Sequence, residues 1–197
     1  MRRFLTLLSL AVLTATPALA QRTEAGVRAF LDSRDDQVKA VLGTRTTFTP
    51  AQRTQLQTLI NGAIDFEAMG QTALGATWAT LTPAQRTQFV TTFSEIVRGQ
   101  SLADLSIYRA PVRYGDVTLS GTTATARTTA TVRGTTARVD YALAWRGTAW
   151  RITDISIDGV STAASYQRQF APVIRQRGFT GLMTALERRA AQQRARG

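Results

Sequence analysis

Carboxylates are the main candidates for chemistry in this chain, because its 197 residues include no histidine and no cysteine. Without these two residue types, Ser-His-Asp and Cys-His catalysis cannot be assembled, and neither can a metal site built on imidazole or thiolate ligands. Serines occur in the stretch STAAS at 161–165, but no base accompanies them, and the sequence has no glycine-rich phosphate-binding motif. Any enzyme made from this chain would therefore depend on aspartate and glutamate.

Three pairs of acidic residues are close enough in sequence to act together: Asp35 with Asp36, Asp65 with Glu67, and Asp154 with Asp158. A glycoside hydrolase needs two carboxylates that face each other across a substrate. The first pair lies on the polar face of a predicted helix, and the second diverges on a helix because its members are two positions apart. The third pair flanks the end of a predicted strand, where a structural hydrogen bond is the expected role. A secreted enzyme that uses Asp154 or Asp158 remains an alternative.

The first 20 residues have the pattern of a cleaved secretory signal peptide. Arg2 and Arg3 precede an apolar run, and the sequence ALA at 18–20 matches a cleavage site. No cysteine follows for lipid attachment, and no later stretch approaches the roughly 18 apolar residues of a membrane helix. We therefore expect residues 21–197 to form a single soluble domain outside the cytoplasm, stabilised by packing alone.

The predicted mature chain is strongly basic. Removing Arg2 and Arg3 from the 24 basic residues leaves 22 against 13 acidic ones, a net charge of +9, and only Lys39 is a lysine. Arginine binds phosphate well, but arginine-rich codon usage is the simpler explanation. The arginines are scattered, without the basic run of a nucleic-acid-binding segment, so we expect no nucleic-acid partner.

Residues 21–110 are predicted to be mainly helical. The heptapeptide TPAQRTQ occurs at 49–55 and again at 82–88. In each copy threonine is a suitable N-cap, proline suits the first helical position, and glutamine can complete a capping box. No third copy exists, so the repetition indicates a shared helix start and not a solenoid.

Residues 111–159 are predicted to form a twisted four-stranded antiparallel meander. Thr, Val, Tyr, Trp and Ile are frequent there, and Gly-Thr pairs recur every 13 residues, at 121–122, 134–135 and 147–148. We expect each pair to form a two-residue hairpin turn.

This register places large apolar residues on one face of the sheet, beside a row of small residues from the second strand. In the middle hairpin it pairs Leu143 with Ala126, and a break in the apolar alternation predicts a bulge near residues 153–154. The small residues either let a helix dock closely or form the floor of a groove.

Residues 160–197 are predicted to form C-terminal helices, with Gly178 ending the first and Pro172 bending or splitting it. Together with the other helices and the sheet, they carry more apolar surface than four small strands require. That surface forms either an ordinary core or a cavity for an apolar ligand. A protein-binding module without a ligand is a further alternative.

Two stretches, residues 65–97 and 139–186, resemble the MlaC (toluene-tolerance auxiliary) family of periplasmic phospholipid-binding proteins. The residues that carry the resemblance are Asp65, Phe66, Leu74, Gly75, Trp78, Thr82, Gln85, Arg86, Phe89, Phe93, Trp150, Asp154, Gly159, Val160, Ser161, Tyr166, Gln169, Phe170, Gly178 and Leu182. Two positions depart from the family pattern: Ser101 stands where a tyrosine is frequent, and Thr162 where an apolar residue commonly follows Gly-Val-Ser.

The resemblance implies an α+β fold in which a nuclear-transport-factor-2-like sheet packs with six to seven helices around an apolar lipid cavity. It also implies a monomeric periplasmic carrier that is not an enzyme and has no cofactor, with a glycerophospholipid as its cargo. Its implied partners are an outer-membrane lipoprotein and an inner-membrane ABC transporter with its periplasmic lipid-binding component.

The apolar residues of the predicted helices and sheet are the candidates for lining this cavity, with ordinary core packing as the alternative for each. They are Phe66, Met69, Trp78, Phe89, Phe93, Val97, Val117, Leu119, Ala126, Tyr141, Leu143, Trp150, Ile152, Tyr166, Phe170, Ile174, Phe179, Leu182 and Met183.

Overall fold

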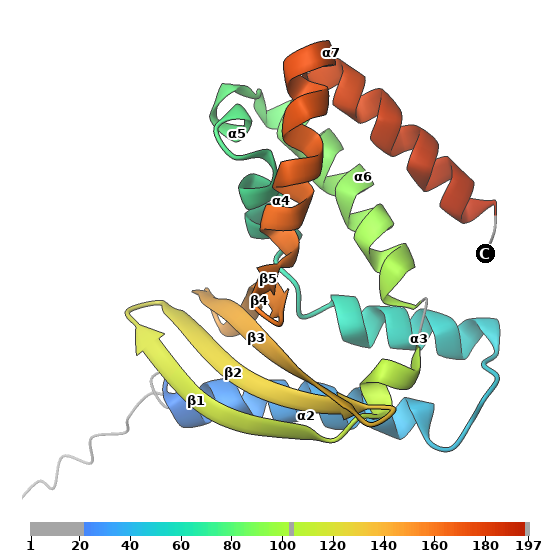
Figure 1. Ribbon diagram of the computed structural model, residues 1–197, viewed down its shortest axis with the longest axis vertical. Helices are drawn as coiled ribbons and strands as arrows, with labels where there is room; N and C mark the ends of the chain where they lie inside the picture. Colours follow the sequence, from blue (N-terminus) through green and yellow to red (C-terminus); the bar gives the residue numbers. More distant parts are fainter. Residues whose placement is uncertain (1–21, 103–104, 196–197) are drawn as a thin grey trace, which may run out of the picture.

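The computed structural model describes residues 22–102 and 105–195, so the predicted signal peptide lies outside the described residues. The described part has an α+β fold. Its α-helices are α2 (Glu24–Leu42), α3 (Pro50–Asn61), α4 (Phe66–Leu74), α5 (Thr77–Thr80), α6 (Pro83–Ser101) and α7 (Thr162–Arg194), and a 3-10 helix, η1, spans Leu105–Arg109. Its strands are β1 (Val112–Ser120), β2 (Thr123–Val132), β3 (Thr135–Arg146), β4 (Ala149–Ile157) and β5 (Val160–Ser161). In Figure 1 the sheet and α2 form one half of the molecule, and α4, α6 and α7 form the other.

Both TPAQ stretches begin helices, as predicted. Thr49 and Thr82 are the N-caps of α3 and α6, and each hydroxyl accepts a hydrogen bond from the backbone N–H of the glutamine three positions later. The side chain of that glutamine accepts a hydrogen bond from the backbone N–H of the N-cap in return. The two helices differ in length, 12 against 19 residues, so the capping motif is shared without a structural repeat.

The strands form one antiparallel sheet in which each strand pairs with the next along the chain. The first long hairpin has the predicted register, with Leu119 opposite Ala124. The last has it from the turn as far as Leu143, but the predicted pair of Tyr141 with Asp154 was wrong, because Tyr141 pairs with Ile155. In the last, Leu143 pairs with Ile152 while the neighbouring Ala142 pairs with Asp154. The residue between those two partners is therefore extra, which confirms the predicted bulge.

The predicted register of the middle hairpin was wrong by two residues. Its turn is formed by Arg133 and Gly134, with φ angles of 51° and 81°, and Leu143 pairs with Ala124 instead of Ala126. A turn with two positive φ angles suits an Arg-Gly pair better than a Gly-Thr pair, which would force a β-branched residue into the left-handed region. Because side chains alternate with a period of two, this shift leaves every residue on its predicted face.

The prediction of four strands was also wrong, because the sheet has a short fifth strand. Asp158 and Gly159 reverse the chain with φ angles of 50° and 82°, so that Val160 pairs with Ile157. The Asp158 carboxylate accepts a hydrogen bond from the backbone N–H of Arg138 at 2.8 Å. This carboxylate therefore has a structural role in the turn.

The helix α7 consists of two arms that meet at Gly178, whose φ of 65° and ψ of −178° are not helical. This break was predicted, but Pro172 does not split the helix, which continues through it. Figure 1 shows the two arms joined by a sharp bend, and the second arm, residues 179–194, packs on α6. In the described part of the chain, no helix is long and apolar enough to cross a membrane.

The buried apolar residues fall into separate clusters. The helical cluster joins α4–α7 and consists of Met69, Ala73, Leu74, Trp78, Leu81, Phe89, Phe93, Ile96, Ala163, Tyr166, Phe170, Leu182, Met183, Leu186 and Ala190. The sheet cluster joins α2 to one face of the sheet and consists of Val27, Leu31, Ala63, Val117, Ala124, Ala126, Leu143, Trp150 and Ile152. A third cluster, centred on Val38, Leu42 and Leu56, lies between α2 and α3.

Candidate functional site

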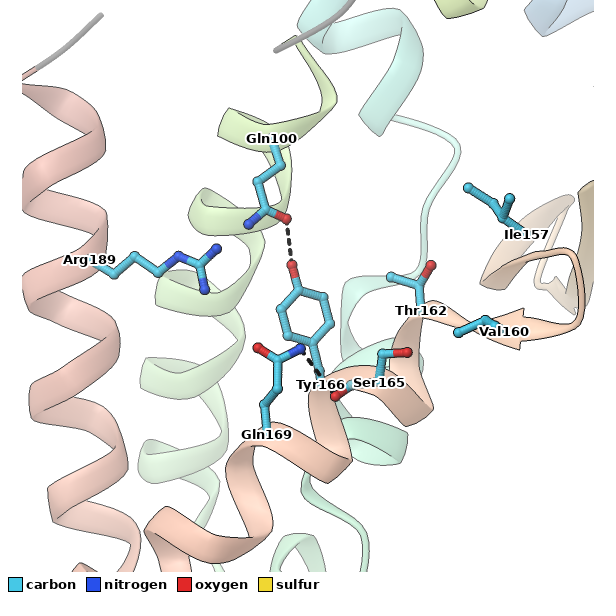
Figure 2. Close-up of a pocket in the computed structure, with 8 residues that line it drawn as sticks. All are labelled: Gln100, Ile157, Val160, Thr162, Ser165, Tyr166, Gln169 and Arg189. Carbon is cyan, nitrogen blue, oxygen red and sulfur yellow. Dashed lines mark hydrogen bonds between the residues drawn. The ribbon is translucent and has the colours of Figure 1, made fainter. Parts of the chain in front are cut away.

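A pocket of about 320 Å³ lies where the end of the sheet meets α6 and both arms of α7. We call it the junction pocket. Figure 2 shows the side chains that line it: Gln100, Ile157, Val160, Thr162, Ser165, Tyr166, Gln169 and Arg189. They come from α6, the β4–β5 turn region and the two arms of α7, so the pocket depends on segments that are far apart in the sequence.

The first turn of α7 is positioned at this pocket by Asp154. The carboxylate of Asp154 accepts hydrogen bonds from the Ser161 hydroxyl and from the backbone N–H of Ala163, the latter at 3.0 Å. The Ser161 hydroxyl in turn accepts a hydrogen bond from the backbone N–H of Ala164, as the N-cap of α7. Asp154 thus anchors the helix start to the sheet, which is a structural role and leaves both of its oxygens occupied.

One wall of the junction pocket is apolar and open to solvent. Ile157 and Val160 are 53% and 56% exposed, and with Ile107 they are the exposed large apolar side chains among the described residues. Exposed apolar side chains that gather at a pocket are typical of a binding surface for an apolar ligand or partner.

The opposite wall is polar, with Tyr166 between the two. The Tyr166 hydroxyl donates a hydrogen bond to the side-chain oxygen of Gln100 at 2.7 Å. Burial raises the pKa of Tyr166, although the positive charge of Arg189 and the bond to Gln100 act in the opposite direction. Figure 2 shows the Arg189 side chain reaching from the second arm of α7 toward Tyr166 and Gln100.

A second pocket, of about 420 Å³, lies between α3 and α6 and has a more polar lining. Asn61 is almost fully buried there, and its amide nitrogen donates to the Gln57 carbonyl and the Ser101 hydroxyl. Ser101, which replaces the tyrosine frequent in the resembling family, therefore supports the packing of α3 on α6.

The predicted lining residues fall mainly into two groups of packed apolar side chains. Members of the helical cluster or packed against it are Met69, Trp78, Phe89, Phe93, Val97, Tyr166, Phe170, Ile174, Phe179, Leu182 and Met183. Members of the sheet cluster or packed against it are Val117, Leu119, Ala126, Tyr141, Leu143, Trp150 and Ile152. Phe66 is buried beneath Arg98, whose guanidinium carbon lies 4.9 Å from the ring centroid.

Of the predicted residues, Tyr166 lines the junction pocket. Sequence reasoning missed the other lining residues as candidates. Two features of the sequence could have identified some of them. The apolar alternation of the last long strand continues to Ile157, and Thr162 departs from the family pattern. Gln100 and Arg189 gave no signal, because each lies among many other polar helix residues.

Several acidic residues of the described part of the chain have structural partners. Within residues 22–102 and 105–195, no three acidic side chains are grouped so as to hold a metal ion. Asp65 caps α4 by accepting from the backbone N–H of Ala68 at 3.0 Å, and it pairs with Arg146 at 2.8 Å. Asp35 pairs with Lys39 at 2.6 Å. Each of these carboxylates is engaged in holding the fold.

An α+β fold with a partly apolar pocket between sheet and helices is typical of a protein that binds an apolar or amphiphilic ligand. Comparison with known proteins gives the family: residues 33–188 match the model of the MlaC protein family, and the chain belongs to this family. No curated protein matches the chain.

Among solved structures, the fold is similar to that of a phospholipid-binding protein from Ralstonia solanacearum in complex with a phospholipid. The TM-score is 0.70 and the sequences are 26% identical, over 86% of this chain and 97% of that one.

Proposed function

We propose that this protein is a soluble periplasmic carrier that binds a phospholipid and shuttles it between an outer-membrane lipoprotein complex and an inner-membrane ABC transporter. The observation that carries the proposal is the match, over nearly the whole length of the other chain, to a structure with a bound phospholipid. Membership of the MlaC family and the signal-peptide pattern of residues 1–20 support a role outside the cytoplasm. The cargo is a glycerophospholipid, and no cofactor or catalytic step is part of the proposal.

The chemistry of the junction pocket fits such a cargo. Transfer of each buried methylene from water is worth about 0.8 kcal/mol, so two tails of about 16 carbons cannot cross the aqueous periplasm unshielded. A carrier therefore needs apolar surface that the lipid tails can cover. Ile157, Val160 and Tyr166 offer the start of such a surface, directly beside the helical cluster.

The volume of the junction pocket implies a movement on loading. About 320 Å³ is at the lower end of the range of ~300–1,000 Å³ found for pockets of drug-sized ligands, and a two-tailed phospholipid is larger than those ligands. We propose that the helical cluster and the sheet cluster move apart at this junction, so that the tails extend between them. The predicted lining residues of both clusters would then face the lipid.

Native mass spectrometry of the purified protein tests the function. We expect a bound species whose mass matches a phospholipid and which is removed by organic extraction. Protein that is consistently free of lipid, even after incubation with phosphatidylglycerol vesicles, would contradict the carrier and favour the protein-binding alternative.

Two arginine substitutions separate lipid contact from core packing. Ile157→Arg changes an exposed side chain at the pocket, so we expect a folded protein that retains little lipid. Leu143→Arg places a charge among the buried side chains of the sheet cluster, where Leu143 is 1% exposed, so we expect it to unfold the protein. If the Ile157 variant keeps its lipid, the junction pocket is not the entry to the cavity.

A further inference from the structure

The junction pocket contains hydrogen-bond donors that no acceptor among the described residues engages. Arg189 lines it, and among residues 22–102 and 105–195 its guanidinium takes part in no hydrogen bond or ion pair. The Gln100 side-chain oxygen accepts from Tyr166, which leaves its amide nitrogen free to donate. No aspartate or glutamate lines this pocket.

Two other arginines near the ends of α6 and α7 have partners. Arg194 pairs with Glu95, and Arg98 lies over the ring of Phe66. The charge of Arg189 instead lies at the pocket, where it acts to lower the pKa of the neighbouring Tyr166. Figure 2 shows its guanidinium on the same side of the Tyr166 ring as the Gln100 amide. An anion placed between these two groups would find donors on two sides.

Such an anion has a specific place relative to the apolar wall. The exposed side chains of Ile157 and Val160 lie at the same pocket as Arg189, so an amphiphile can contact both at once. Arginine binds phosphate oxygens through two parallel hydrogen bonds, which are stronger than neutral ones. The combination is complementary to a phosphodiester attached to hydrocarbon.

We propose that Arg189, assisted by Gln100, binds the phosphate of the lipid head group at the mouth of the junction pocket. This proposal rests on the proposed function, since the phosphate belongs to the cargo. It makes the carrier selective for lipids that carry phosphate over neutral lipids with the same tails. Arg189 lies on the second arm of α7, so head-group binding also holds this arm against the rest of the pocket.

The test compares Arg189→Gln with the matched control Arg188→Gln, which removes the same charge from the adjacent, exposed position on the same helix. Binding of fluorescent phosphatidylglycerol and of diacylglycerol with the same tails is measured by titration, with circular dichroism as the folding control. We expect the Arg189 variant to bind phosphatidylglycerol about tenfold more weakly, the size of effect that loss of a charge-assisted hydrogen bond produces. Its binding of diacylglycerol should be unchanged, and the control should match the wild type with both lipids.

Several outcomes would overturn the proposal. An equal loss of both lipids assigns Arg189 to the apolar site or to the fold, and an equal loss in the Arg188 variant shows a general effect of net charge. Titration with inorganic phosphate distinguishes a free-anion site: phosphate binding that depends on Arg189, with phosphatidylglycerol binding unaffected, removes the lipid from the proposal. A wild-type protein that binds neither lipid contradicts the carrier function itself, whereas an unaltered Arg189 variant contradicts the head-group site alone.

Discussion

Replacing Gly178 by alanine tests whether the bend of α7 depends on a backbone conformation that only glycine adopts easily. At Gly178 the φ of 65° and ψ of −178° fall in a region that is essentially restricted to glycine. An added Cβ would meet no atom within 4 Å. The expected loss of stability therefore comes from backbone strain and not from steric overlap. Such strain costs about 1–3 kcal/mol. The lower entropy of the unfolded chain with alanine offsets about 0.4–1 kcal/mol of it.

The strain cannot be relieved cheaply by releasing the second arm of α7. This arm buries Leu182, Met183 and Leu186 in the helical cluster, and each large apolar side chain contributes about 1.5–3 kcal/mol on burial. Undocking the arm therefore costs more than the strain it would remove. We expect the arm to stay docked and the free energy of unfolding to fall by about 1–2 kcal/mol, within the effect of strained positions.

Urea unfolding followed by circular dichroism measures this effect. With a slope of about 1–3 kcal/mol per molar urea, the midpoint should fall by roughly 0.5–1 M. The matched control is Gly115→Ala, at a residue without positive φ where the new Cβ makes an ordinary contact of 3.5 Å with the Arg127 carbonyl. It should leave the midpoint unchanged or raise it slightly. An unchanged midpoint for the Gly178 variant, or an equal drop in both variants, would refute the reasoning.

Three other predictions address the carboxylates and the tyrosines. Asp154→Ala removes the acceptor for two donors at the start of α7 and should lower the free energy of unfolding by about 1–3 kcal/mol. Asp154→Asn should keep lipid binding. A folded Asp154→Asn protein that no longer binds lipid would support an acid–base role for this residue. Asp65→Ala removes the N-cap of α4 and should lower the free energy of unfolding by about 0.5–2 kcal/mol. Arg146→Gln removes only the half-exposed ion-pair partner of Asp65. In the same urea assay it should lower the free energy of unfolding by at most about 1 kcal/mol. Burial, with a smaller contribution from the charge of a neighbouring tyrosine, raises the pKa of Tyr108 from 10.0 to about 12. The stability contributed by the protonated Tyr108 hydroxyl is therefore complete below about pH 10 and is lost as the pH rises toward 12. Tyrosinate absorbance should appear at higher pH in the native protein than in the urea-unfolded protein. Coincident titration curves would contradict this.

Local signals in the sequence predicted the elements well where one residue type decides the geometry. The capping boxes at Thr49 and Thr82 and the break at Gly178 follow from the bonding capacity of threonine and glutamine and the freedom of glycine. The middle turn was misplaced because Gly134 belongs to both an Arg-Gly and a Gly-Thr pair, and only the backbone angles distinguish them. The fifth strand was missed because two residues carry no periodic pattern.

The pocket was harder to predict than the fold, for a physical reason. Apolar periodicity identifies which residues are buried, but it does not distinguish a side chain that packs on its neighbours from one that lines a space. Phe89 and Phe93 stack with centroids 5.3 Å apart, and they are fully buried in the helical cluster. The residues at the junction pocket, such as Gln100 and Arg189, meet only through the bend of α7 and its packing on α6.

The division of the apolar interior supports the opening that we propose for lipid loading. The segment between α3 and α4 runs along the edge of β4: Ile152 donates to the Ala63 carbonyl and accepts from the backbone N–H of Asp65, each at 2.8 Å. Ala63 belongs to the sheet cluster, whereas its neighbour Ile64 packs on the helical cluster, because adjacent side chains of an extended segment point to opposite sides.

The two clusters are thus joined along this segment largely by directional bonds, and the Asp65–Arg146 ion pair adds one more. Hydrogen bonds and ion pairs fix the relative position of two halves without merging their apolar surfaces into one core. The proposed opening would expose apolar area where the two clusters meet at the junction pocket. Lipid tails inserted at the junction would cover that area, so loading would offset the cost of the opening that it requires.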